Sequence, residues 1–315
     1  MKANYAKPWM DFPDQLAKLE AKGLHVGDRA EALEFLSYVN YYRFSRFCLP
    51  FQTVSAQSPK RRFVQGTDFA DVKALCVLDR ELRDAFSDGL EMIEISLRSC
   101  IAHWFAKAHG PFGHADIRNF DRSAKWPFHG QTDSRYDNWH DKVLSETKRS
   151  KETFVLHFEA TYAEYPELPL WAVAELCSFG SLSMMYSFMQ KPDMNAIAAQ
   201  YKLQSVFLES WLHTFSYLRN LCAHHARLWD KRMSIRPKVP VGKAWEAVRH
   251  NPSNVFFAAL MVNWMLSHDS FDPDFHAKWK REIEGIADRL HGRFPQFRAI
   301  TGFSDGWKRN PIWSL

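Results

Sequence analysis

Basic, amide and imidazole side chains gather in one short segment, directly after an apolar helical pattern. Residues 217–232 read YLRNLCAHHARLWDKR. The side chains of this segment that suit acid–base or phosphate chemistry are Arg219, Asn220, His224, His225 and Arg227. This is the part of the sequence that argues most strongly for a chemical role.

These residue types suit the cleavage of a phosphodiester without a metal ion. A histidine with an unperturbed pKa of about 6.5 can take the proton of a ribose 2′-OH and return one near neutral pH. An arginine, which stays charged, stabilises the negative charge that builds on the phosphate oxygens. An asparagine can hold a phosphate oxygen or orient the imidazole. His224, Arg219 and Asn220 supply these three types.

Helix geometry limits how these side chains can cooperate. At about 100° per residue, Arg219 and His224 lie about 140° apart on a continuous helix, whereas Asn220 and His224 share one face. One undistorted helix therefore cannot direct Arg219 and His224 at the same atom. Either the helix ends or bends between them, or two copies of the chain face each other across a twofold axis, which predicts a homodimer.

Three other interpretations of the segment stay open at this point. His224 and His225 could bind a metal ion, although adjacent residues diverge on a helix and only Asp230 lies near to complete a ligand set. Arginine and histidine near a helix end could serve stability alone, by capping carbonyls and complementing the helix dipole. The segment could also bind a nucleotide phosphate without cleaving it.

Other candidate positions are weaker. Arg98 and His103 repeat the spacing in LRSCIAHW, with Ser99 in place of asparagine. Because this segment lies inside a strongly periodic helical pattern, we interpret His103 as a helix-face residue that could still line the same cleft. His213 precedes the candidate site on the same predicted helix and is a weaker, accessory candidate.

Two segments of the N-terminal region are candidate RNA contacts. Tyr42 and Arg43 lie in NYYRF. This segment has two interpretations: a corner of the core in which the arginine has hydrogen-bond partners, or an exposed aromatic platform on which RNA bases stack. The polar stretch 53–67 is predicted to be a loop, either solvated or in contact with phosphate. Its three consecutive basic residues are Lys60, Arg61 and Arg62.

The composition is that of a globular protein with a large core. Of 315 residues, 46% are hydrophobic and 24% charged, and 25 Phe and 12 Trp predict an aromatic-rich interior. The net charge of +5 is compatible with a polyanionic partner without requiring one. Five scattered cysteines without a CxxC pair argue against a disulfide framework or a zinc ribbon and favour the reducing cytoplasm. No signal peptide and no membrane-spanning stretch is visible.

Helical periodicity dominates and no clear run of alternating strand pattern appears, so the fold class is predicted to be all-α. Asp28 and Glu31 form a capping-box pattern at the start of an early helix. The pattern from Asp68 to about Ala108 is interpreted as one helix with a break or two helices in succession. An irregular insertion is expected at 111–140, and a kink near Gly180. The remaining predicted helices cover residues 14–22, 28–40, 138–165, 171–189, 193–201, 204–222, 253–268 and 274–292.

The segment RNLCAHHARLWD, residues 219–230, resembles the signature of the Abi-like family of the AbiD and AbiF type. That family belongs to the wider HEPN group of helical nucleases, whose motif is an arginine, usually a polar residue, and a histidine after four to six positions. In the closing block of the family, which corresponds to residues 302–307, Ser304 stands where a proline is expected. Similar blocks follow in the same order as in the family, and they are FLSYVNYYRFSRFCLPF (35–51), EISLRSCIA (94–102) with GPF (110–112), LWAVAELCSFGSLS (170–183) and GFSDGW (302–307).

The resemblance implies a HEPN-type helical bundle with additional N- and C-terminal helices, built as a single Abi-like domain over residues 1–315. Its parts would be an N-terminal helical subregion at about 1–67, a HEPN-like core at about 68–268, and a C-terminal helix and tail at 269–315.

The resemblance also implies an activity, that of a metal-independent endoribonuclease toxin of phage defence that needs no cofactor. It would cleave cellular RNA and be held in check by a small RNA or protein antitoxin. Arg219 would stabilise phosphate charge, His224 would act as acid and base, and Asn220 would organise the site. His225 and Arg227 would assist.

Two other functions remain as alternatives. A non-catalytic RNA-binding or sensing module of the same fold predicts salt-sensitive RNA binding that survives His224→Ala while no cleavage occurs. A metal-dependent phosphohydrolase predicts that the purified protein carries a metal ion.

Overall fold

The computed structural model describes residues 6, 8–55, 58–127, 132–268 and 272–315, and their side chains except those of 55 and 58–60. Within these residues the chain forms fourteen α-helices, several short 3-10 helices and one two-stranded sheet. The predicted all-α fold class is confirmed. None of the described helices combines the length and the apolar character that crossing a bilayer requires.

The chain divides into two compact units, residues 1–81 and residues 82–315. Each is described by itself. A single helix, α4 (Phe69–His109), contributes its beginning to the first unit and the rest to the second.

The first unit is a small helical cluster around aromatic side chains. Phe44 stacks on Phe69 with ring centroids 4.7 Å apart, and Phe35 meets both rings edge-on. The Asp28 side chain accepts the backbone N–H of Glu31 at 3.0 Å, so the predicted N-cap is confirmed. The elements of this unit before α4 are α1 (Phe12–Glu20), α2 (Arg29–Val39), α3 (Tyr41–Cys48), β1 (Gln52–Ser55) and β2 (Ser58–Phe63).

The strands β1 and β2 correct the prediction of a loop at 53–67. They pair antiparallel, with Gln52 opposite Phe63 and Thr53 opposite Arg62. The ladder joins the helical part through Phe63, whose N–H donates to the carbonyl of Lys22 at 2.9 Å and whose ring is buried. The hairpin was not predicted because its strands lack the alternating apolar side chains that indicate a strand. Backbone hydrogen bonds between the two strands stabilise it instead.

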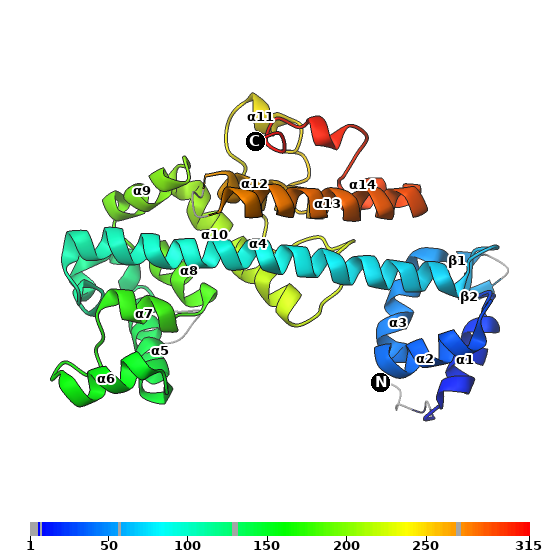
Figure 1. Ribbon diagram of the computed structural model, residues 1–315, viewed down its shortest axis with the longest axis horizontal. Coiled ribbons are helices and arrows are strands. Elements are labelled where there is room, and N and C mark those ends of the chain that lie inside the picture. Colours follow the sequence, from blue (N-terminus) through cyan, green and yellow to red (C-terminus); the bar gives the residue numbers. More distant parts are fainter. Residues whose placement is uncertain (1–5, 7, 56–57, 128–131, 269–271) are drawn as a thin grey trace. The chain divides into compact units, whose positions relative to one another are not determined.

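Helix α4 is unbroken over 41 residues, so the break considered from the sequence is absent (Figure 1). Its predicted apolar stripe is confirmed, because all eight positions are buried. These positions are Val72, Leu75, Leu78, Leu82, Phe86, Leu90, Ile93 and Leu97. The helix ends before Gly110, whose φ of 80° leaves the right-handed helical region.

The second unit surrounds the remainder of α4 with shorter helices. Trp279 of α13 donates its indole N–H to the carbonyl of Ala85 at 2.7 Å, and α13 runs alongside α4 in Figure 1. Helix α12 is buried on all sides. The helices of this unit after α4 are α5 (Arg135–Arg149), α6 (Thr153–Thr161), α7 (Leu170–Leu176), α8 (Phe179–Ser187), α9 (Lys191–Gln200), α10 (Ser205–Ala223), α11 (Lys243–Glu246), α12 (Val255–Ser267), α13 (Pro273–Arg293) and α14 (Arg298–Thr301).

Two predicted helices are each divided in two. Residues 138–165 form α5 and α6, separated by the extended Ser150. Residues 171–189 form α7 and α8, because Ser178 leaves the helical conformation and its hydroxyl caps the N–H of Ser181 at 3.2 Å. The kink expected near Gly180 is therefore a full helix break two residues earlier.

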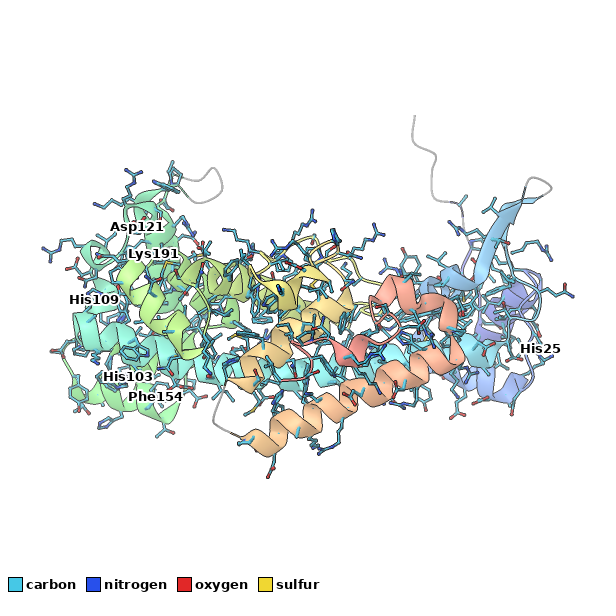
Figure 2. All side chains as sticks on the ribbon, turned by 90° about the horizontal axis from the view of Figure 1, so that it is seen from above. His25, His103, His109, Asp121, Phe154 and Lys191 are labelled. Carbon is cyan, nitrogen blue, oxygen red and sulfur yellow. The ribbon has the colours of Figure 1, made fainter. Side chains whose placement is uncertain are left out.

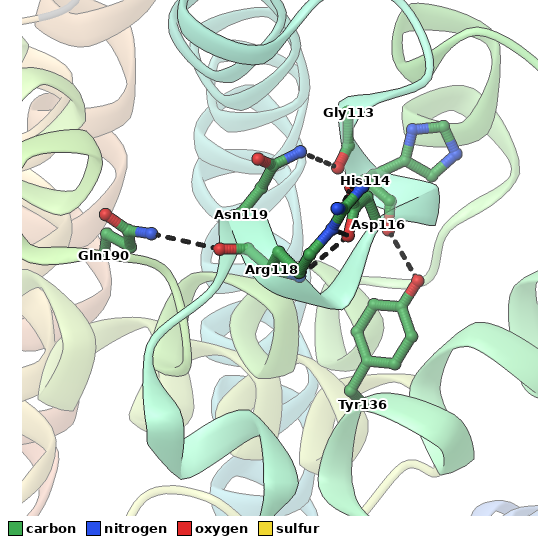
Figure 3. A network of polar contacts seen from close by, with 7 residues as sticks. All are labelled: Gly113, His114, Asp116, Arg118, Asn119, Tyr136 and Gln190. Atoms are coloured by element: carbon green, nitrogen blue, oxygen red, sulfur yellow. Dashed lines mark hydrogen bonds and ion pairs between the residues drawn. The ribbon is translucent and has the colours of Figure 1, made fainter.

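The insertion expected at 111–140 ends earlier than predicted, because α5 already begins at Arg135. Its described part contains three short 3-10 helices tied by local polar contacts (Figure 3). Asn119 donates its amide to the carbonyl of Gly113 at 2.8 Å, and the Tyr136 hydroxyl donates to the carbonyl of His114 at 3.1 Å. These bonds give an irregular segment a defined course.

Candidate active site

Helix α10 carries the candidate residues and is anchored by one apolar face. The apolar pattern before the candidate residues predicts a stripe of Phe207, Trp211, Phe215, Leu218 and Cys222, and all of these are buried except Phe207, which is half-buried. The helix packs chiefly against α8 and α9. Because this face is fixed in the core, the opposite face is presented outward in a defined orientation.

The end of α10 is a Schellman turn built on a histidine. The N–H of Ala226 donates to the carbonyl of Leu221 at 2.8 Å, and the N–H of His225 donates to that of Cys222 at 2.9 Å. His225 has a φ of 54°, a left-handed conformation in which glycine is usual. His224 is the C-cap, with φ −91° and ψ 13°. The two adjacent histidines therefore leave the helix in different directions.

Arg219, Asn220 and His224 all lie at the surface. The Arg219 side chain is 46% exposed, and its Nε lies 4.0 Å from Oε2 of Glu94. Within the described residues, the imidazole of His224 has no hydrogen-bond or ion-pair partner. The guanidinium is thus oriented from one side, while the imidazole is open to an incoming group.

Glu94 was not predicted from the sequence and is the carboxylate that links two arginines. It is nearly buried on α4, accepts a hydrogen bond from Arg98 at 2.6 Å, and faces Arg219 with its other oxygen. The i, i+4 spacing of Glu94 and Arg98 was the available signal. It did not point to Arg219, which is distant in the chain.

Arg98 has a structural position rather than a place in the candidate site. Its guanidinium donates to the carbonyls of Ala174 and Cys177, each at 3.0 Å, and so closes the end of α7. His103 lies further along α4 (Figure 2) and lines a separate cavity of about 500 Å³ with Cys100. The Arg98–His103 pair therefore repeats the spacing without forming a second site of this kind.

Arg227 is turned back towards its own loop. Its Nε lies 2.9 Å from the Asp230 carboxylate. Burial raises the pKa of Asp230, although the facing Arg227 acts in the opposite direction. The carbonyl of Ala226 accepts a hydrogen bond from Arg83 at 3.3 Å. These contacts fix the loop that follows His225, which is a supporting role for Arg227.

The position of His224 bears on the two geometries open from the sequence. Its backbone N–H still donates to the carbonyl of Asn220 at 3.0 Å, so the helical path continues through His224. Helix α10 runs without a bend from Arg219 to Ala223 and ends there, one residue before its C-cap His224. Within one chain the two side chains therefore diverge, as two positions about 140° apart on a helix must.

The candidate RNA contacts of the first unit fall on two elements. Tyr42 is 70% exposed on α3, with the guanidinium of Arg46 over its ring at 5.3 Å, whereas Arg43 is half-buried. Arg61 and Arg62 are exposed on β2. The side chain of Lys60 lies outside the described residues. These residues belong to the first unit and α10 to the second.

Metal binding finds no support in the arrangement of ligands. Among the residues that the structure describes, no three His, Cys, Asp or Glu side chains are grouped so as to hold a metal ion. Among the described residues, His224 and His225 therefore have no third ligand nearby, which a metal site would require.

The fold and the site define an all-helical protein with an exposed arginine, asparagine and histidine at the end of a core-anchored helix. The profile of the Abi-like protein family matches residues 34–230, so the chain belongs to this family. The matched range includes the first three sequence blocks and the segment 219–230, while the block 302–307 lies beyond it. No curated protein and no solved structure matches the chain.

Proposed function

We propose that the chain is a metal-independent endoribonuclease that acts in phage defence. Membership of the Abi-like family points to abortive infection. The observation that carries the enzymatic part is the exposed trio Arg219, Asn220 and His224 at the end of α10, with His224 free of side-chain partners among the described residues. The proposal also includes the placement of this chain in the HEPN group of helical nucleases.

The proposed reaction is an attack of the ribose on its own phosphodiester. His224 takes the proton from the 2′-OH, whose oxygen forms a bond to phosphorus while the bond to the 5′ oxygen breaks. The leaving oxygen takes up a proton, and the products are a 2′,3′-cyclic phosphate and a 5′-OH. Arg219 stabilises the charge on the phosphate oxygens, and Asn220 holds one of them or the imidazole.

Glu94 positions the arginine in this scheme. A guanidinium facing a nearly buried carboxylate loses part of its freedom, so less entropy is lost when the phosphate binds. Since Glu94 also holds Arg98, the carboxylate itself is fixed by α4 and α7.

The divergence of Arg219 and His224 leads us to include a homodimer in the proposal. Two α10 ends facing each other across a twofold axis would bring the arginine of one copy to the histidine of its partner. The composite site would hold two imidazoles, one to accept the 2′ proton and one to protonate the leaving oxygen.

The test is expression of the wild type beside His224→Ala and Arg219→Ala, with end-mapping of total RNA. Only the wild type should arrest growth and produce ends that carry 2′,3′-cyclic phosphate, and EDTA should not inhibit cleavage by the purified protein. Because both side chains are exposed, both variants should fold with unchanged circular dichroism. Cleavage that persists in His224→Ala would refute the assignment. RNA binding without cleavage in all three proteins would favour the sensing module instead.

A further inference from the structure

A groove on the second unit lies on the same side of α10 as the candidate active site. Its volume is about 580 Å³, and it lies between α8, α10 and the chain around Arg135 and Lys238. Its size falls in the range of ligand-binding pockets, which is about 300–1,000 Å³. None of its lining residues was assigned a role above except His213, a weak candidate from the sequence.

Helical phase places this groove next to the catalytic side chains. Glu209, His213 and Ser216 line the groove from α10. At about 100° per residue, these three positions and those of Asn220 and His224 all fall within about 80° around the helix. Ser216 and Asn220 are one turn apart, about 6 Å along the axis. The groove therefore lies on the same face of α10 as Asn220 and His224, one turn before Asn220.

The charges of the groove suit a phosphodiester strand. Among the described residues of the lining, Arg135 and Lys238 contribute two cations and His213 an imidazole, against one carboxylate, that of Glu209. Lys238 is exposed, and within the described residues its ammonium group has no hydrogen-bond or ion-pair partner. Arg135 is oriented by a hydrogen bond to the Ser187 hydroxyl at 2.5 Å. A phosphate bound here would contact one cation of fixed orientation, Arg135, and one that can change its conformation, Lys238.

The walls of the groove are held rigidly by backbone contacts. The N–H of Lys238 donates to the Ser210 hydroxyl at 2.9 Å, and the carbonyl of Lys238 accepts the indole N–H of Trp211 at 2.9 Å. On the opposite wall, Gly180 allows α8 to approach α10, since a Cβ there would lie 3.2 Å from the Ser216 hydroxyl. A preformed groove binds without the loss of loop entropy.

We propose that this groove binds the nucleotide that adjoins the cleaved bond of an RNA substrate. Lys238 and Arg135 contact its phosphate, and the apolar part of the lining, which includes Met184, receives the base or sugar. The proposal rests on the ribonuclease function proposed above for the face of Asn220 and His224, and it adds the part of the site that gives affinity for the strand.

Binding is tested in the His224→Ala background, so that the RNA stays intact. The probe is a labelled single-stranded RNA oligonucleotide of mixed sequence, measured at several salt concentrations. Adding Lys238→Ala should raise Kd roughly fivefold, as for the loss of one partly exposed charged contact, and lower the salt slope by about one. The backbone bonds of Lys238 remain in this variant. Glu209→Gln should lower Kd, because it removes the one carboxylate among the described residues that line the groove.

The matched control is Lys148→Ala, which removes an exposed lysine of α5 outside the groove. Equal values of Kd and salt slope for Lys238→Ala and Lys148→Ala would overturn the proposal. In the chain with His224 intact, Lys238→Ala should raise KM and leave kcat within about twofold, since the contact serves binding in ground and transition state alike. Because Kd is measured without cleavage, a failure here is separate from a failure of the His224 test.

Discussion

His225 has a left-handed backbone conformation that favours glycine. Its φ of 54° at the end of α10 places the Cβ close to the neighbouring carbonyl, a cost that glycine does not have. We expect His225→Gly to raise the free energy of unfolding by about 1 kcal/mol, as measured by urea denaturation. A histidine kept at this position despite its cost is consistent with the assisting role proposed for it.

The neighbouring position serves as the control for this prediction. His224 has a φ of −91°, so His224→Gly should gain nothing and lose stability through the greater freedom of the unfolded chain. If both glycine variants shifted the unfolding midpoint in the same direction, the left-handed conformation of His225 would not be the cause.

His114 is a buried histidine that should make the protein sensitive to acid. Its side chain is fully buried, with Nε2 3.9 Å from Glu167. Burial lowers the pKa of His114 to about 4, with Glu167 opposing and His140 adding to the shift. As the pH falls from about 6.5 to about 4, the unfolded chain binds a proton that the folded chain does not bind. Stability should therefore fall through this window by up to about 1.4 kcal/mol per pH unit and then level off.

The variant His114→Gln tests this assignment. It removes the titrating group, so its free energy of unfolding, measured by urea denaturation at several pH values, should change less between pH 6.5 and pH 4 than that of the wild type. Glu167 also contributes at lower pH. Burial would raise its pKa, but the hydrogen bond and charge of His140 bring the pKa below its ordinary value. An unchanged pH profile in His114→Gln would assign the acid sensitivity to other groups.

At the scale of elements, Gly89 allows α4 to approach α12 and α13. A Cβ at this position would lie 2.7 Å from the indole nitrogen of Trp279 and 2.9 Å from a methyl group of Val262. Both contacts are shorter than real Cβ atoms show. Gly89→Ala should therefore destabilise the fold by about 1–3 kcal/mol in spite of the better helix propensity of alanine.

Gly285 provides the matched control in α13. A Cβ there would meet no atom within 4 Å, so Gly285→Ala should stabilise the helix by about 0.5–1 kcal/mol. Thermal and urea unfolding of the two variants should shift in opposite directions. Shifts of the same sign would mean that helix packing around Gly89 is looser than the structure indicates.

The elements show what apolar periodicity can and cannot predict. The stripes of α4 and α10 follow from side chains three and four positions apart, and their burial is confirmed. The break between α7 and α8 depends on a single hydroxyl cap at Ser178, which competes only weakly with the helical pattern. The hairpin of β1 and β2 lacks an apolar alternation altogether.

At the scale of the whole molecule, the proposed composite site requires two chains. Arg219→Ala and His224→Ala should each be inactive alone. After mixing under conditions that exchange subunits, the pair should recover part of the wild-type cleavage, because one copy supplies the arginine and its partner the histidine. Light scattering of the active protein should give twice the 36.8 kDa of one chain.

A site complete within one chain would behave differently. The mixture would then be no more active than the single variants, and the specific activity of the wild type would not fall on dilution. A fall in specific activity on dilution, together with recovery in the mixture, would support the dimer.

The sequence by itself determined the helical class, the apolar faces and the triad of Arg219, Asn220 and His224. These depend on residue types at short spacings, and a helix converts such spacings into shared faces by fixed geometry. The same rule predicts from the sequence alone that Arg219 and His224 diverge.

Only the tertiary structure decided what surrounds the triad. Glu94 reaches Arg219, and Lys238 joins the groove beside Asn220, through packing between segments that are distant in the chain. The structure also distinguishes the candidate site from Arg98, which begins the same spacing but caps the end of α7. Local patterns fix the direction of a side chain on its own helix, whereas its partner is set by the helices that pack against it.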